Sequence, residues 1–171
     1  RLDVRGWLSD VRRVLGVGRP ARNRLVYALM TIGPPTGVLR QLAKGSWLSD
    51  AALSTGGSYV AYVVSLDRDT PDNNGVWVVP TSDAAARRFD FVGAYRWRDD
   101  RRLVYIPMAP GEASHAVWQI DVVSGVPERL FDPATTPIRV AGNDWSISPD
   151  GQSLAFLAEI DRNIWLIDLP R

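Results

Sequence analysis

Residues 145–156 read WSISPDGQSLAF, and residues 161–168 read DRNIWLID. The first four residues are typical of a short strand, and residues 153–158 are typical of a second one. Between them, Pro149-Asp150-Gly151 predicts a tight turn, because proline presets φ at the first turn position and glycine accepts positive φ. Residues 164–167 predict a third strand that contains Trp165. The stretch therefore predicts three antiparallel strands joined by polar turns.

The same unit recurs along the chain at a regular spacing. Two copies are clear, with strand pairs at 59–62 and 76–79 and at 103–105 and 117–120, and a looser copy lies at 14–17 and 25–29. Aromatic residues stand in the second strand of each pair at positions 27, 77, 118 and 165, a period of roughly 40 to 50 residues. Repeats of this length made of short strands are typical of propeller blades, so the sequence predicts an all-β propeller fold.

Each blade is expected to have four antiparallel strands. Outer strands are predicted at 39–42, 87–89 and 128–130, where polar and apolar residues alternate. The chain is interpreted as a single propeller module or a fragment, with blades at about 4–45, 46–92, 93–141 and 142–171. Residues 1–3 resemble the tail of an outer strand, so the N-terminus of this chain or of a neighbouring copy could complete the last blade. Three alternatives stay open: the four blades close alone, two copies form eight, or further blades belong to a longer chain.

Composition excludes several classes of function. The chain has 171 residues, of which 46% are hydrophobic and 23% charged, so it is expected to fold. Its net charge of +1 gives no bulk attraction to nucleic acid or to an anionic membrane. The absence of cysteine excludes disulfides and thiolate chemistry. No apolar run reaches the roughly 18 residues of a membrane span, and a start at Arg1 looks trimmed from something longer.

Residues 145–156 and 161–168 resemble the repeat of TolB-like bacterial propellers, a WD40-like (PD40-type) family with the rough pattern W-S-P-D-G-x-x-I-A-F, a polar loop, and x-I-Y/W-x-x-D. The match is good in the last blade, fair in the two middle blades and weak in the first. The last blade has an extra Ile147, and the first and third blades lack Pro-Asp-Gly. The resemblance implies a periplasmic or extracellular bacterial protein that binds proteins, peptides or envelope components. It also implies an alternative, the substrate-gating propeller of a prolyl-oligopeptidase-like hydrolase.

The loops on one face of the propeller are expected to form the binding surface. They carry a mixture of charges that is suited to docking a protein or peptide. Trp47 is a further candidate, as an exposed binding aromatic, because it fits the repeat less well than Trp77, Trp118 and Trp165, which are expected to pack between blades. The candidate loop residues are Arg19, Arg22, Asp67, Asp69, Asp72, Glu112, His115, Glu159, Asp161 and Arg162.

The segment at 67–75, DRDTPDNNG, is weighed as a calcium site because its three carboxylates and two amides could supply oxygen ligands. Its order lacks the alternating ligands and the terminal glutamate of an EF-hand loop. It is therefore interpreted as an ordinary polar loop that ends in an Asn-Gly turn. We predict no metal and no other cofactor.

No catalytic residue is predicted. His115 is the only histidine, and the chain has no G-x-S-x-G elbow that could pair with it. Asp69, Glu112 and Glu159 lie in corresponding loops, so a propeller glycosidase is kept as an alternative. The leading expectation is a non-catalytic binding scaffold with a protein or peptide partner and without nucleic acid. A homodimer or further blades would complete its assembly.

Overall fold

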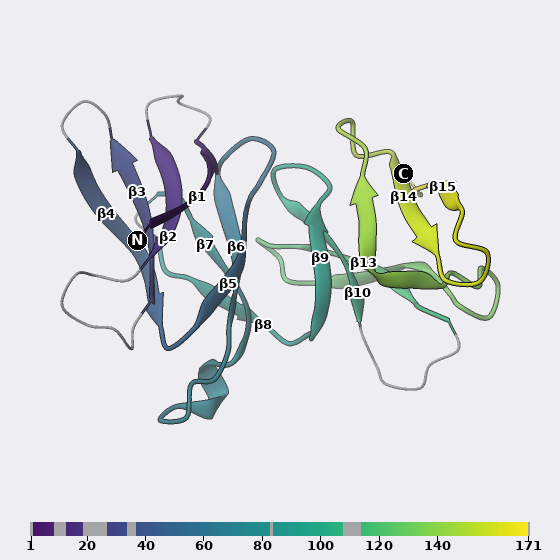
Figure 1. Cartoon of the computed structure of the whole chain (residues 1–171), viewed down its shortest axis with the longest axis horizontal. Coiled ribbons are helices and arrows are strands. Elements are labelled where there is room, and N and C mark those ends of the chain that lie inside the picture. The colour runs from purple at the N-terminus through teal and green to yellow at the C-terminus, as the bar shows by residue number, and fades with distance from the viewer. Residues whose placement is uncertain are drawn as a thin grey trace. The chain divides into compact units, whose positions relative to one another are not determined.

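The computed structural model describes residues 2–8, 13–18, 27–33, 37–82, 84–107 and 114–170. These residues form fifteen strands and one short 3-10 helix, η1 (Pro71–Asn73). The strands make four antiparallel sheets, and within each sheet every strand pairs with its neighbours in sequence (Figure 1). The all-β fold predicted from the repeats is confirmed.

The chain divides into two compact units, Arg1–Phe91 and Val92–Arg171. Unit 1 contains the first two sheets, and unit 2 contains the last two. The division falls next to the predicted blade boundary between residues 92 and 93.

The sheets of unit 1 have the strand orders β1-β2-β3-β4 and β5-β6-β7-β8. Buried side chains from both sheets, including Leu15, Leu29, Val60 and Tyr62, form one apolar cluster. Burial raises the pKa of Tyr62 to about 12. The strands are β1 (Leu2–Trp7), β2 (Val14–Gly18), β3 (Tyr27–Gly33), β4 (Val38–Gly45), β5 (Leu48–Leu53), β6 (Tyr59–Val64), β7 (Gly75–Pro80) and β8 (Arg87–Phe89).

Unit 2 has a four-stranded sheet, β12-β11-β10-β9, and a three-stranded sheet, β13-β14-β15. Its apolar cluster includes Val104, Val117, Leu154 and Phe156. The strands are β9 (Gly93–Trp97), β10 (Arg102–Pro107), β11 (Val117–Asp121), β12 (Pro127–Phe131), β13 (Val140–Ile147), β14 (Ser153–Ala158) and β15 (Ile164–Asp168).

The predicted turn at Pro149-Asp150-Gly151 joins β13 to β14. Gly151 has φ +70°, and its N–H donates to the Ser148 carbonyl at 2.8 Å. The Ser148 hydroxyl donates to the Asp150 carboxylate at 2.5 Å, and this bond is the main reason that the pKa of Asp150 lies below its ordinary value. The turn prediction is therefore confirmed, and its serine closes the turn through a side-chain bond.

Leu2 and Asp3, the two of residues 1–3 that are described, do not complete the last sheet of their own chain, so that form of the prediction is wrong. Completion of the last sheet by a neighbouring copy stays a prediction. Leu2 pairs with Gly18 and Asp3 pairs with Val17, so both belong to β1 of the first sheet. The connection from β1 to β2 is short, and pairing between strands close in sequence costs little loop entropy.

The expected burial of Trp165 between blades is also wrong. Its side chain is 53% exposed, whereas Trp77 and Trp118 are half-buried. β15 is the last strand of its sheet, so Trp165 lies at the sheet margin, where its indole N–H donates to the Asp161 carboxylate at 3.1 Å.

Candidate binding pocket between the first two sheets

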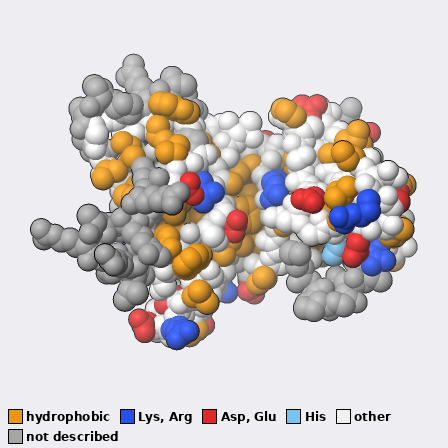
Figure 2. All heavy atoms as spheres, in the orientation of Figure 1, with side chains coloured by type: hydrophobic (Ala, Val, Ile, Leu, Met, Phe, Trp, Pro, Cys, Tyr) orange, Lys and Arg blue, Asp and Glu red, His pale blue; other side chains and the backbone are white. Residues whose placement is uncertain are grey.

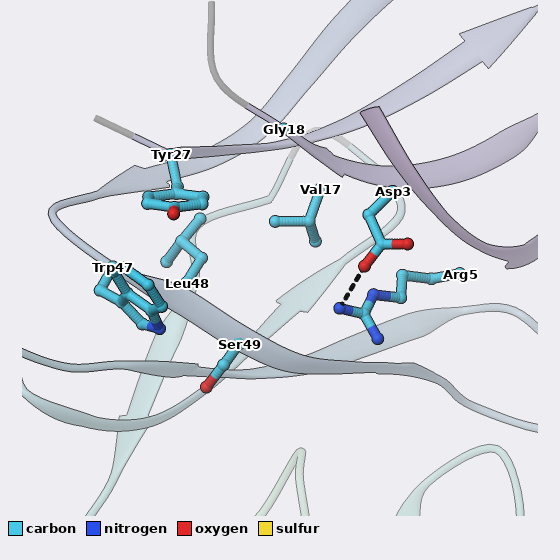
Figure 3. Close-up of a pocket in the computed structure, with 8 residues that line it drawn as sticks. All are labelled: Asp3, Arg5, Val17, Gly18, Tyr27, Trp47, Leu48 and Ser49. Atoms are coloured by element: carbon cyan, nitrogen blue, oxygen red, sulfur yellow. Dashed lines mark ion pairs between the residues drawn. The ribbon is translucent and has the colours of Figure 1, made fainter. Parts of the chain in front are cut away.

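A pocket of about 540 Å³ lies within unit 1, where the first sheet meets the start of β5 (Figure 3). Aromatic side chains occupy one side of it and an ion pair the other. The first sheet contributes residues from three strands, and the second sheet contributes the beginning of β5 and the residue before it. The lining residues are Asp3, Arg5, Val17, Gly18, Tyr27, Trp47, Leu48 and Ser49.

Trp47 and Tyr27 form the aromatic side of the pocket. Their ring centroids are 5.0 Å apart and the rings are tilted by 53°. Trp47 lies between β4 and β5, and its carbonyl accepts the Ser65 N–H at 3.0 Å, while the next residue, Leu48, is buried in the core. These contacts hold the indole at the surface, where it remains 43% exposed. A half-exposed aromatic held on a fixed backbone is a common anchor for a ligand.

Asp3 and Arg5 form the charged side. The register of β1 against β2 shifts between Val4 and Gly6, so Arg5 is the extra residue of a bulge, and bulges commonly redirect side chains. The Arg5 guanidinium lies 2.7 Å from the Asp3 carboxylate, with the side chains 37% and 65% exposed. Ion pairs this exposed contribute about 0–1 kcal/mol. A ligand can therefore bind either partner without a large loss of stability.

The pocket combines an apolar aromatic wall with one carboxylate acceptor and one guanidinium donor. This combination of groups can bind an extended polar ligand that also carries apolar groups. Among the described residues that line the pocket there is a single carboxylate, Asp3, and no histidine, so these residues do not assemble the paired carboxylates of a glycosidase.

The predicted site residues are distributed over both units. Of those described, Trp47 is the one that lines this pocket. Unit 1 also holds Asp67, Asp69 and Asp72, and unit 2 holds His115, Glu159, Asp161 and Arg162. Arg19, Arg22 and Glu112 lie outside the described residues. The binding role of all these residues, and the mixed-charge rim that they were expected to form, stay predictions.

The acidic loop between β6 and β7 is organised around Asp67. Its carboxylate accepts the Thr70 N–H at 3.0 Å and the Asn73 side-chain amide at 3.2 Å. Asn74 closes the loop, since its side-chain oxygen accepts the Asp67 N–H at 2.9 Å. Asp69 and Asp72 remain exposed. Within the described part of the chain, no three histidine or acidic side chains are grouped so that they could hold a metal ion.

The candidate residues of unit 2 make local contacts. Glu159 pairs with Arg139 at 3.0 Å. Asp161 accepts the Asn163 N–H at 3.0 Å, and this bond is the main reason that its pKa lies below the ordinary value. His115 is half-buried, and its backbone N–H donates to the Ile138 carbonyl at 2.7 Å. Arg162 is exposed and has φ +59°.

Sequence reasoning missed four polar or aromatic residues of the pocket, namely Asp3, Arg5, Tyr27 and Ser49. Tyr27 was assigned to the repeated aromatic position, and Asp3 was assigned to the last blade. One signal could have revealed the charged pair: Asp3 and Arg5 are two residues apart in a short strand, a spacing that places side chains on one face.

No protein-family model matches the chain, and no curated protein matches its sequence. Solved structures do match, and the three described here are each 14% identical to this chain. TolB from Acinetobacter baumannii is 14% identical with a TM-score of 0.58, over 97% of this chain and 42% of TolB. The β-propeller domain of the Trilobed protease from Pyrococcus furiosus is 14% identical with a TM-score of 0.61, over 99% of this chain and 55% of that one. This chain consists of β-propeller blades.

An oligogalacturonate lyase from Vibrio parahaemolyticus has the same fold, with 14% identity and a TM-score of 0.67, over 98% of this chain and 51% of the lyase. The blades thus span about half the length of these three structures. The likeness shows a propeller fold that occurs both in TolB and in enzymes. In the part of the chain that is described, no helix has the length and apolar character needed to cross a membrane.

Proposed function

We propose that this chain is a non-catalytic binding scaffold that holds a peptide segment of a partner protein in the pocket formed by Trp47, Tyr27, Asp3 and Arg5. The observation that carries the proposal is that the exposed Trp47, in contact with Tyr27, lies opposite an exposed ion pair across one pocket. The TolB-like resemblance supports an extracytoplasmic location, in the periplasm or outside the cell.

The chemistry of the pocket suits a peptide in two ways. The aromatic wall can accept a proline or another apolar side chain, which is the usual anchor of a peptide in a groove. The Asp3 carboxylate can accept a peptide N–H or pair with a lysine or arginine, and the Arg5 guanidinium can donate to peptide carbonyls or carboxylates. Because the ion pair itself is only weakly stabilising, exchanging it for ligand contacts costs little.

Binding to an array of short peptides tests the proposal. The wild-type chain should select peptides in which an apolar or proline residue lies next to a charged residue. Trp47→Ala should weaken the best of these interactions by about 30-fold, as expected when a central aromatic anchor that contributes about 2 kcal/mol is removed. Arg5→Gln should weaken it by a smaller factor.

Trp165→Ala is the matched control, because it removes an exposed tryptophan from unit 2. It should leave peptide affinity unchanged. Equal loss in both tryptophan variants, or no peptide selected at all, would contradict the proposal. Selection of oligosaccharides from a glycan array, with Trp47 required, would instead assign the pocket to a glycan.

The second candidate is a substrate-gating propeller of a hydrolase. The match to the propeller domain of a protease favours this alternative. In that case a catalytic domain would accompany the blades, and peptides selected by the array would be substrates of that domain. Cleavage of a selected peptide by the purified chain itself would contradict the non-catalytic proposal.

A further inference from the structure

A second, smaller pocket in unit 1 is lined by β4 of the first sheet, by β6 and β7 of the second sheet, and by the loop that carries η1. We call it the Tyr62 pocket. Its volume is about 220 Å³, and pockets for drug-sized ligands usually measure roughly 300–1,000 Å³. Its described lining shares no residue with the Trp47 pocket. It is therefore a separate site, and its size suits a small molecule.

Tyr62 brings a buried hydroxyl group to this pocket. Its side chain belongs to the core of unit 1, and the residue is 4% exposed. Among the described residues, none forms a hydrogen bond with this hydroxyl, and burial is the one cause that raises its pKa. A buried polar group without a partner is unfavourable. Because Tyr62 lines the pocket, a bound molecule can supply the missing partner.

Hydrogen bonds position the other functional groups of the pocket. Trp77 is the cross-strand partner of Tyr62, and its indole N–H donates to the Asn73 carbonyl at 2.7 Å. The Asn73 side-chain amide in turn donates to the Asp67 carboxylate at 3.2 Å. That carboxylate also accepts the Thr70 N–H at 3.0 Å, and a carboxylate offers about four acceptor positions. The indole and the carboxylate are thus held in place, and the carboxylate can still accept a further bond.

The charges of the pocket favour a positively charged ligand. Among the described lining residues, Lys44 and Asp67 are charged. Lys44 is exposed, and a lysine side chain keeps its ammonium group in water, whereas Asp67 is half-buried. The exposed charges of the adjoining loop are Arg68, Asp69 and Asp72, and Figure 2 shows both signs around the short helix η1 of Figure 1. The charge nearer the interior is therefore negative, and it lies beside an indole ring, which also attracts cations.

We propose that the Tyr62 pocket binds a small organic amine whose ammonium group pairs with the Asp67 carboxylate beside the Trp77 ring. A polar atom at the other end of the ligand forms a hydrogen bond with the Tyr62 hydroxyl. The apolar body between these two ends contacts Leu42 and Val64, which also line the pocket, and gains free energy by leaving water. This site goes beyond the peptide scaffold proposed above, and either proposal can fail without the other.

Calorimetric titration of the purified chain with three probes of similar size tests the proposal. Tyramine carries an ammonium group and a hydroxyl at opposite ends of an aromatic ring. Phenethylamine lacks the hydroxyl, and para-hydroxyphenylpropanoate has a carboxylate in place of the ammonium group. The wild type should bind tyramine, and it should bind phenethylamine about 5-fold more weakly, because one hydrogen bond is lost. The carboxylate probe should bind least, because Asp67 repels it.

Two variants separate the roles of the hydroxyl and the carboxylate. Tyr62→Phe should weaken tyramine binding by about 5-fold and leave phenethylamine binding unchanged. It should not lower the melting temperature, because the hydroxyl has no partner among the described residues. Asp67→Asn keeps an acceptor for the Thr70 N–H but should weaken both amines by about 10-fold or more, because it removes the charge. Asp90→Asn is the control, since Asp90 is 97% exposed and is not among the lining residues.

Several results would overturn the proposal. One is a wild-type chain that does not bind tyramine at millimolar concentration. Another is tighter binding of the carboxylate probe than of tyramine, which would make Lys44 the recognition group. Equal loss of affinity in Asp67→Asn and Asp90→Asn would remove the role of Asp67. If Tyr62→Phe weakened both amines equally, the Tyr62 hydroxyl would not contact the ligand. This last comparison decides the matter even if Asp67→Asn does not fold, which circular dichroism would show.

Discussion

At the scale of single residues, Arg98 explains how unit 2 is held together. Its side chain is buried, and its guanidinium donates to the Gly151 carbonyl at 2.9 Å, the Gln119 side-chain oxygen at 2.7 Å and the Pro170 carbonyl at 2.7 Å. Gln119 belongs to β11, whereas Gly151 and Pro170 flank β14 and β15. Burial is the main reason that the pKa of Arg98 lies below its ordinary value. One side chain thus links the two sheets of the unit.

Arg98→Met should lower the free energy of unfolding of unit 2 by about 2–4 kcal/mol, because it leaves three acceptors without their donor. Urea unfolding measures this change. Arg101→Met is the control, since Arg101 is 58% exposed and pairs with Asp121 at the surface. It should cost less than about 1 kcal/mol. Equal costs for the two variants would show that Arg98 has no special role.

Gly151, whose carbonyl accepts the Arg98 side chain, also lies close to the Arg98 backbone. A Cβ atom at this position would lie 2.4 Å from the Arg98 carbonyl oxygen, and φ is +70°. Gly142 provides a matched control, because its φ is +62° but a Cβ there meets nothing within 4 Å. Gly142→Ala should cost about 1 kcal/mol for the left-handed backbone alone. Gly151→Ala should lower the free energy of unfolding clearly more than Gly142→Ala does. Equal decreases in the melting temperature of the two variants would contradict the steric argument.

At the scale of elements, the strands could be predicted well because short apolar runs alternate with strong turn signals. The segments predicted at 153–158 and 87–89 coincide with β14 and β8. The sheet to which Leu2 and Asp3 belong was predicted wrongly, because the sequence of a strand does not specify which strand it pairs with. The burial predicted for Trp165 was wrong for a related reason. The repeat predicts the position of Trp165 in its blade, but burial depends on a neighbouring strand, and β15 is the last strand in its sheet.

The turn after β11 should make unit 2 sensitive to acid. Asp121 accepts the N–H groups of Val123 and Ser124 at 2.9 Å each and pairs with Arg101 at 2.9 Å. The Ser124 bond is the largest cause that holds the pKa of Asp121 below its ordinary value. The folded pKa is therefore lower than the unfolded value of about 3.9. The stabilisation is present above that unfolded value and is lost as pH falls through the folded pKa.

Asp121→Asn should consequently lower the melting temperature at neutral pH. Between about pH 5 and pH 3, the melting temperature of the variant should then fall less than that of the wild type. Thermal unfolding at several pH values measures both effects. Asp90→Asn is the control, because the Asp90 side chain is 97% exposed and lies 3.6 Å from Arg88. If the melting temperatures of wild type and Asp121→Asn fell in parallel with pH, the role given to Asp121 would be contradicted.

At the scale of the whole molecule, the propeller fold could be predicted from the sequence, but most of the binding pocket could not. Trp47 stood out because it departs from the repeat. Asp3, Arg5 and Tyr27 join it only because β1 pairs with β2, and because the start of β5 then lies against the first sheet. Such contacts between different strands depend on tertiary packing. A single blade motif does not encode them.

The central claim is that the Trp47 pocket is where the scaffold holds its partner. Hydrogen–deuterium exchange, measured by mass spectrometry with and without the best peptide from the array, tests it most directly. We expect slower exchange in β1, at the start of β3 and at residues 46–49, with little change in unit 2. Protection confined to the loops of unit 2, such as residues 159–162, would contradict the claim.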